Sequence, residues 1–183
     1  MVLLESTSLP IGTVLPHFNL KDPQHNLFDS TKMIGENGIL IKFTCNHCPY
    51  ALAIWDRYIK LSEFAIDHGI SVVAINPNIH PDYPDDSPEK MLEFILKKSI
   101  HFPYLVDQDQ RVAKSYQAQC TPDIYLLKQD MSLFYHGQLD NNWQNESAVT
   151  TFDLHEALQL LASNKPAPTR QYPSMGCSIK WLQ

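Results

Sequence analysis

The stretch Gly38-Ile-Leu-Ile-Lys-Phe-Thr-Cys45-Asn-His-Cys48-Pro49 decides how the rest of this chain is interpreted. Its first half, residues 38–43, is a β-branched and aromatic run of strand length, which predicts a buried strand. After Pro49, apolar residues recur at helical spacing, namely Leu52, Trp55, Ile59 and Ile66. This pattern predicts an amphipathic helix. Cys45 and Cys48 therefore lie where a strand passes into a helix.

Pro49 places Cys48 at the start of the predicted helix. Proline is favoured at the first helical position because the amide that it lacks would have no partner there. At the N-cap, Cys48 would face unpaired amides and the positive end of the helix dipole, and both stabilise a thiolate. His47 adjoins Cys48 and, when protonated, adds to this effect; the alternative is a solvated loop histidine. Because Cys45 can attack a mixed disulfide on Cys48, the pair has the minimum equipment for dithiol–disulfide exchange.

Four short strings of this sequence are similar to strings of one known family. They are Cys45-Asn-His-Cys48-Pro-Tyr, Cys120-Thr121-Pro122, Gly12-Thr-Val-Leu-Pro-His-Phe-Asn-Leu20 and Gly176-Cys177-Ser-Ile-Lys-Trp181. Together they resemble the thioredoxin superfamily, in its redoxin or peroxiredoxin-like (AhpC/TSA-like) branch, over nearly the whole chain. The resemblance implies an α/β thioredoxin-like fold, with a central mixed β-sheet flanked by helices and an N-terminal β-hairpin. It also implies that Pro122, after Thr121, is a cis-proline facing the two redox cysteines.

The composition is that of an ordinary globular protein. Of the 183 residues, 44% are hydrophobic and 19% are charged, and the formal net charge is -6. This charge and the lack of a Lys/Arg cluster argue against nucleic acid or an anionic membrane surface as a partner. With no secretory-type start and no apolar run of membrane-spanning length, we expect a cytoplasmic protein. Four cysteines in such a reducing compartment are more typical of catalysis or metal binding than of cross-links.

The length fits one domain, residues 1–183. Residues 71–76 predict a second strand, parallel to the first and joined to it by a right-handed crossover. The other expected elements are a hairpin built on Val14, Phe18 and Leu20, a helix over 88–98, a strand over 104–106, a helix over 110–116, a hairpin of 123–127 with 132–135, and a helix lined by Leu154, Ala157, Leu158 and Leu161. The proline-rich tail, 164–183, ends in cysteine, isoleucine and tryptophan, so we expect it to dock on the domain.

The long loop 77–87 follows the second strand. Since parallel strands end on the same edge of a sheet, this loop should border Cys48, as a substrate rim or lid or as a plain surface loop. Its side chains His80, Asp82, Asp85 and Asp86 suggest a metal only weakly, because no two share a recognised ligand spacing.

The resemblance bears on which cysteine attacks. In thioredoxins the first cysteine lies five residues after the Phe that closes the strand, and counting from Phe43 gives Cys48. Cys48-Pro49 also matches the Cys-Pro of peroxiredoxins. We therefore predict that Cys48 attacks and Cys45 resolves; the alternative is that Cys45 attacks while Cys48 is buried.

The predicted activity is thiol–disulfide exchange on protein or small-molecule disulfides, regenerated by an external thiol reductant such as a thioredoxin system, with no cofactor or bound metal. An antioxidant, peroxidase role for Cys48 is the alternative. It is expected to be slow, because Thr44 is one residue out of the peroxiredoxin register and the arginine expected near Thr121 is missing.

The sequence leaves open the roles of two cysteines, and it allows two classes of function besides a redox enzyme. Cys120 and Cys177 are either accessory redox residues or buried thiols. Cys45, His47 and Cys48 with Cys120 or Cys177 could instead form a structural zinc site, although the second closely spaced pair that such sites use is absent. A redox-inactive interaction module is the third class.

Overall fold

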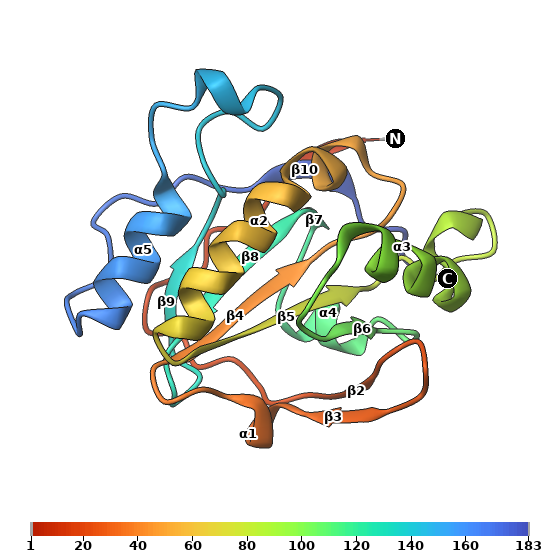
Figure 1. The fold of residues 1–183 in the computed structure, drawn as a ribbon, viewed down its shortest axis with the longest axis horizontal. Coiled ribbons are helices and arrows are strands. Elements are labelled where there is room, and N and C mark those ends of the chain that lie inside the picture. Colours follow the sequence, from red (N-terminus) through yellow and green to blue (C-terminus); the bar gives the residue numbers. More distant parts are fainter. Residues whose placement is uncertain (1, 183) are drawn as a thin grey trace.

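The structure is a computed structural model that describes residues 2–182. A mixed seven-stranded sheet has the strand order β3-β2-β6-β5-β4-β8-β9, and a small sheet has the order β1-β10-β7 (Figure 1). The strands of the large sheet are β2 (Asn19–Lys21), β3 (Leu27–Asp29), β4 (Gly38–Phe43), β5 (Ile70–Asn76), β6 (Tyr104–Val106), β8 (Asp123–Leu127) and β9 (Leu133–His136). Those of the small sheet are β1 (Leu3–Glu5), β7 (Cys120–Thr121) and β10 (Met175–Ser178).

The centre of the large sheet is parallel and its β8-β9 side is antiparallel. Strand β4 pairs in parallel with β5, β5 pairs in parallel with β6, and β8 runs antiparallel to both β4 and β9. The predicted crossover between the first two core strands is therefore confirmed. Because β4 and β5 are parallel, the loops that follow Phe43 and Asn76 leave the same edge of the sheet.

Helices cover both faces of the sheet. They are α1 (Ser30–Met33), α2 (Pro49–Asp67), α3 (Pro88–Lys98), α4 (Arg111–Ser115) and α5 (Asp153–Ala162), with short 3₁₀ turns η1 (Pro84–Asp86) and η2 (Glu146–Ala148). Alternate residues of β4 point to opposite faces, so Leu40 packs in a core with α2, α3 and α5, whereas Ile39 and Ile41 pack in a core with α4. Figure 1 shows α2 lying in front of β8 and β4. Among residues 2–182, no helix combines the length and the apolar character needed to span a bilayer.

The N-terminal hairpin is present but shorter than predicted. It consists of β2 and β3, and β2 also pairs with β6 at the edge of the sheet. Val14 was wrongly included in it: its side chain is 69% exposed, and its backbone bridges to Ser132 instead. Pro16, which cannot donate to a ladder, separates Val14 from β2.

The C-terminal tail docks on the body of the protein, as predicted. Strand β10 lies between β1 and β7 and is antiparallel to both. Figure 1 shows it beside the first turn of α2. The tail thus lies at the helix start that carries the two cysteines.

Candidate active site

The helix start is built as the sequence predicts. Strand β4 ends at Phe43, α2 begins at Pro49, and Cys48 is the N-cap residue with an extended backbone. The Cys45 and Cys48 side chains are fully buried and share a small contact cluster with Ala51 and Cys177. Both sulfurs are therefore shielded from water in this conformation.

The loop before β8 faces both sulfurs. The Thr121–Pro122 peptide bond is cis, which confirms the expectation drawn from the resemblance. The Thr121 hydroxyl lies 3.2 Å from the Cys45 sulfur, and the Cys48 sulfur lies 3.0 Å from the Thr121 carbonyl oxygen, to which Cys48 donates only in its thiol form. Thr121 thus contacts one cysteine through its side chain and the other through its backbone.

Donors around Cys48 favour its thiolate. Hydrogen bonds from the thiols of Cys45 and Cys177 and from the Ala51 amide lower the pKa of Cys48 from 9.0 to about 5, against the opposing effect of burial. The Ala51 amide, in the first turn of α2, has a smaller effect on this pKa than either thiol. The neighbouring thiols therefore contribute more than the helix start itself, which is a finding beyond the sequence argument.

Cys45 is shifted in the opposite direction. Burial, hydrogen bonding to Cys48 and the nearby charge of Asp86 raise the pKa of Cys45 well above its ordinary value, while the Thr121 hydroxyl lowers it in part. The two opposite shifts therefore favour the negative charge on Cys48 and the proton on Cys45. This is the order of the two cysteines that the sequence favours.

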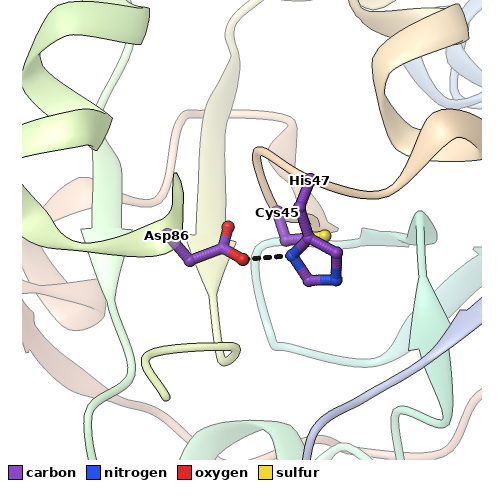
Figure 2. Close-up of side chains that lie close together, drawn as sticks. All are labelled: Cys45, His47 and Asp86. Carbon is purple, nitrogen blue, oxygen red and sulfur yellow. Dashed lines mark hydrogen bonds and ion pairs between the residues drawn. The ribbon is translucent and has the colours of Figure 1, made fainter. Parts of the chain in front are cut away.

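Asp86 holds the two residues between the cysteines. Its fully buried carboxylate accepts a hydrogen bond from the Asn46 amide over 2.6 Å and another from the Asn76 side chain over 3.0 Å. Its second oxygen contacts Nδ1 of His47 (Figure 2). The loop 77–87 does border the cysteines as predicted, but through Asp86, which the sequence indicated only as part of a weak metal pattern.

His47 is fixed by this loop rather than by solvent. Its ring stacks on Tyr83, with ring centroids 4.6 Å apart, and only 10% of its side chain is exposed. The interpretation as a solvated loop histidine is therefore wrong. The groups described above account for the low pKa of Cys48 without His47, whose effect on that cysteine stays a prediction.

Three possible metal ligands meet here, in a set that differs from the predicted one. The Cys45 sulfur, a His47 ring nitrogen and an Asp86 carboxylate oxygen lie within 4.8 Å of one another (Figure 2). Asp86 was not expected in a zinc set with Cys45 and His47. The imidazole and the carboxylate already contact each other through Nδ1, whereas Nε2 of His47 is buried without a hydrogen-bond partner among residues 2–182.

The remaining two cysteines are separated by strand geometry. Cys120 and Thr121 are consecutive residues of β7, so their side chains point to opposite faces. The Cys120 thiol points toward the carbonyls of Pro122, 3.5 Å away, and Ser174, 4.0 Å away. Burial raises the pKa of Cys120 far above its ordinary value. Cys177, by contrast, belongs to the same contact cluster as both redox cysteines and hydrogen-bonds to Cys48.

Sequence reasoning missed Lys42, which lies beneath the cysteines in β4. Its side chain is fully buried, with Nζ 3.2 Å from the centroid of the Trp55 ring and 4.3 Å from that of Tyr58. Within residues 2–182, Nζ has no hydrogen-bond partner. A lysine inside an otherwise apolar strand was the signal that could have found it.

The fold and this site define a thioredoxin-like redoxin. A family model described as the AhpC/TSA family matches residues 11–136. The chain belongs to the AhpC/TSA family, whose membership indicates oxidoreductase or peroxidase chemistry. No curated protein matches the chain.

Solved structures agree with this assignment. An uncharacterised conserved protein from Geobacillus kaustophilus is 38% identical with a TM-score of 0.94, covering 100% of this chain and 97% of that one. A hypothetical protein from Sinorhizobium meliloti 1021 is 36% identical with a TM-score of 0.91, covering 97% and 98%. The peroxidoxin BcpB from Mycobacterium tuberculosis, at 15% identity and a TM-score of 0.63, covers 85% and 98% and shares the fold alone.

Proposed function

We propose that this protein is a thiol–disulfide oxidoreductase in which Cys48 attacks and Cys45 resolves. The observation that carries the proposal is the opposite shift of the two sulfurs, with the pKa of Cys48 lowered to about 5 and that of Cys45 raised. A thiolate is the attacking species in disulfide exchange, and a protonated neighbour is a resolving thiol held in reserve.

The reaction proceeds through a mixed disulfide. The Cys48 thiolate attacks one sulfur of a protein or small-molecule disulfide, the substrate S–S bond breaks, and the leaving thiolate takes a proton. The Cys45 thiol then loses its proton and attacks the Cys48 sulfur, which releases the second substrate thiol and leaves a Cys45–Cys48 disulfide. An external dithiol, of the kind that a thioredoxin system supplies, reduces this disulfide and restores the starting state.

Cys45 needs a base, and two neighbours support its deprotonation. The Thr121 hydroxyl lies 3.2 Å from the sulfur and can donate to the forming thiolate. The contacting pair formed by the His47 ring and the Asp86 carboxylate also has a nitrogen and an oxygen within 4.8 Å of this sulfur, and in our proposal it accepts the proton. Thr121 therefore stabilises the Cys45 thiolate as it forms, and His47 with Asp86 takes up its proton.

Peroxide reduction by Cys48 is the weaker alternative. A peroxidase needs donors for the charge that develops on the breaking O–O bond. An arginine could be such a donor, but Arg57 on α2 is already engaged. It donates to Asp140 and to the carbonyls of Asn142 and Trp143. We therefore expect slow turnover with hydrogen peroxide.

The test compares the wild type, Cys48→Ser and Cys45→Ser in two assays, reduction of insulin disulfides and consumption of hydrogen peroxide. We expect disulfide reduction by the wild type and none above background by Cys48→Ser. Full activity of Cys48→Ser in both assays would overturn the assignment of the nucleophile. Zinc bound in a one-to-one ratio, with two thiols protected from alkylation, would instead favour a metal-binding function.

A further inference from the structure

The C-terminal strand places a third sulfur against the redox pair. In the antiparallel pairing of β10 with β7, Cys177 lies directly opposite Thr121. Side chains of directly opposed residues point to the same face of a sheet, so Cys177 shares the face of the Thr121 hydroxyl, which contacts Cys45. Cys45, Cys48 and Cys177 accordingly form one contact cluster with Ala51.

This approach of the tail is built into the backbone. A Cβ added at Gly176 would lie 2.1 Å from the Thr121 carbonyl oxygen and 3.0 Å from the Pro122 ring, so only glycine allows β10 to lie this close. Just after Cys177, backbone hydrogen bonds from Ser178 to Val2 and from Ile179 to Gln119 tie the chain to the segments next to β1 and β7. The sulfur of Cys177 is therefore delivered to Cys48 by a strand that the rest of the chain fixes in place.

We propose that Cys177 is a second resolving cysteine and that the tail is a built-in disulfide partner of Cys48. This inference rests on the proposed function, because it needs Cys48 as the attacking thiol. After Cys48 has formed a mixed disulfide with a substrate, the Cys177 sulfur attacks the Cys48 sulfur. The bond to the substrate breaks, the substrate leaves as a thiol with the proton of Cys177, and a Cys48–Cys177 disulfide remains.

The two resolving thiols then compete for one sulfur. Attack by Cys45 on the Cys48–Cys177 disulfide returns Cys177 to the thiol form and gives the Cys45–Cys48 disulfide, with no change in the total number of disulfides. An external dithiol closes the cycle from either disulfide. The hydrogen bond that Cys177 already donates to Cys48 places the two sulfurs in direct contact before any substrate arrives.

Cys120 is the matched control. It lies next to Thr121 in the same strand, but on the opposite face, and its thiol is directed at the carbonyls of Pro122 and Ser174. Burial raises the pKa of both Cys120 and Cys177, so the thiol form prevails in each and the face of the strand is the main difference between them. A serine at position 120 should therefore leave the exchange unchanged.

The experiment removes the competing thiol and follows one mixed disulfide. The full chain with Cys45→Ser is reacted with oxidised glutathione and followed by intact mass and tryptic peptide mapping. We expect a transient glutathione adduct on Cys48, followed by a disulfide between peptides 43–57 and 171–180. In Cys45→Ser/Cys177→Ser the adduct should persist on the order of tenfold longer or more, because an intramolecular thiol is lost. In Cys45→Ser/Cys120→Ser it should decay as in the single variant.

The failures are distinguishable. An adduct that decays equally slowly with and without Cys177 would overturn this inference and leave the proposed function intact, as would a link from Cys48 to peptide 115–128. If Cys48 forms no adduct in any variant, the proposed function and this inference fall together. Circular dichroism of each variant checks its fold. Gly176→Ala in the Cys45→Ser background provides an independent test, because moving β10 away should slow formation of the Cys48–Cys177 disulfide.

Discussion

The carboxylate of Asp86 lies 2.6 Å from the amide nitrogen of Asn46, so the loop after β5 grips the residues between the two cysteines. The same buried carboxylate contacts His47 and accepts from Asn76. One side chain from a loop thereby fixes the conformation of the Cys-x-x-Cys turn.

We predict that Asp86→Ala lowers the free energy of unfolding by about 2–4 kcal/mol, because one buried and two partly buried polar groups lose their partner. Urea denaturation of the reduced protein measures the change. The matched control is Asp85→Ala, since that neighbouring side chain is exposed and only its carbonyl is used by Asn46. An equal effect of the two substitutions would contradict the role given to Asp86.

The low pKa of Cys48 predicts how reactivity depends on pH. Alkylation of the reduced protein by iodoacetamide should rise with pH around a midpoint of about 5, and Cys48→Ser should lack this phase. Absence of the phase below pH 7 in the wild type would remove the main support for Cys48 as the nucleophile.

The same shift predicts a pH dependence of stability. The pKa of Cys48 in the folded protein, about 5, is below the ordinary value of 9.0. Between these two pH values the folded state therefore binds fewer protons than the unfolded state. The contribution of Cys48 to stability is then complete above about pH 9 and is lost as the pH falls through about 5. Over this window the free energy of unfolding of the wild type should rise with pH more steeply than that of Cys48→Ser, as measured by urea denaturation.

The hydroxyl of Thr121 should matter for the resolving step. Thr121→Val removes the hydroxyl that lies 3.2 Å from the Cys45 sulfur. The Cys45 thiolate then loses the hydrogen bond that lowers its pKa. We expect release of the substrate from the mixed disulfide to slow about fivefold, the equivalent of one hydrogen bond. Thr44→Val is the control, because the buried Thr44 hydroxyl has no partner within residues 2–182. Stopped-flow measurement of product release in both variants decides the point.

The buried Lys42 side chain should lower the free energy of unfolding. Burial lowers the pKa of this lysine well below its ordinary value of 10.5, so protonation of the amine is less favourable in the folded protein than after unfolding. Lys42→Met is expected to raise the free energy of unfolding by about 1–2 kcal/mol. This gain over the wild type should grow as the pH falls below 10.5, because the unfolded lysine then takes up a proton more readily than the folded one. Lys60→Met, at an exposed site 3.4 Å from Glu146, should change stability little. A large loss of stability in Lys42→Met would show that the contacts with Trp55 and Tyr58 outweigh the desolvation of the amine.

The docked tail offers a separate test by hydrogen exchange. Gly176→Ala should speed exchange of the β10 amides relative to the wild type, because the added methyl group meets the Thr121 carbonyl. Gly12→Ala, where an added Cβ meets nothing within 4 Å, tests whether any destabilising alanine gives the same result. Equal exchange in β10 of both variants would mean that the tail does not depend on this close approach.

Local pattern in the sequence was sufficient for the elements that carry the site. The apolar run before Cys45, the proline after Cys48 and the helical spacing beyond it predicted β4, the N-cap and α2, because each depends on neighbouring residues. The hairpin failed at Val14, where periodicity continued but Pro16 had already interrupted the strand. The docked tail was predicted from its apolar end, although not its partner.

Tertiary structure decided everything that joins distant parts of the chain. Asp86 reaches Asn46 and His47, and Cys177 reaches Cys48, only because the crossover and the docked strand bring these segments to one edge of the sheet. The pKa of Cys48 is lowered most by Cys45, its neighbour along the chain, and further by Cys177 from the docked strand. Spacing along the chain can indicate which sulfur begins a helix, but the burial of each sulfur and the donors packed around it, Cys177 of a remote strand among them, favour ionisation of Cys48 over Cys45.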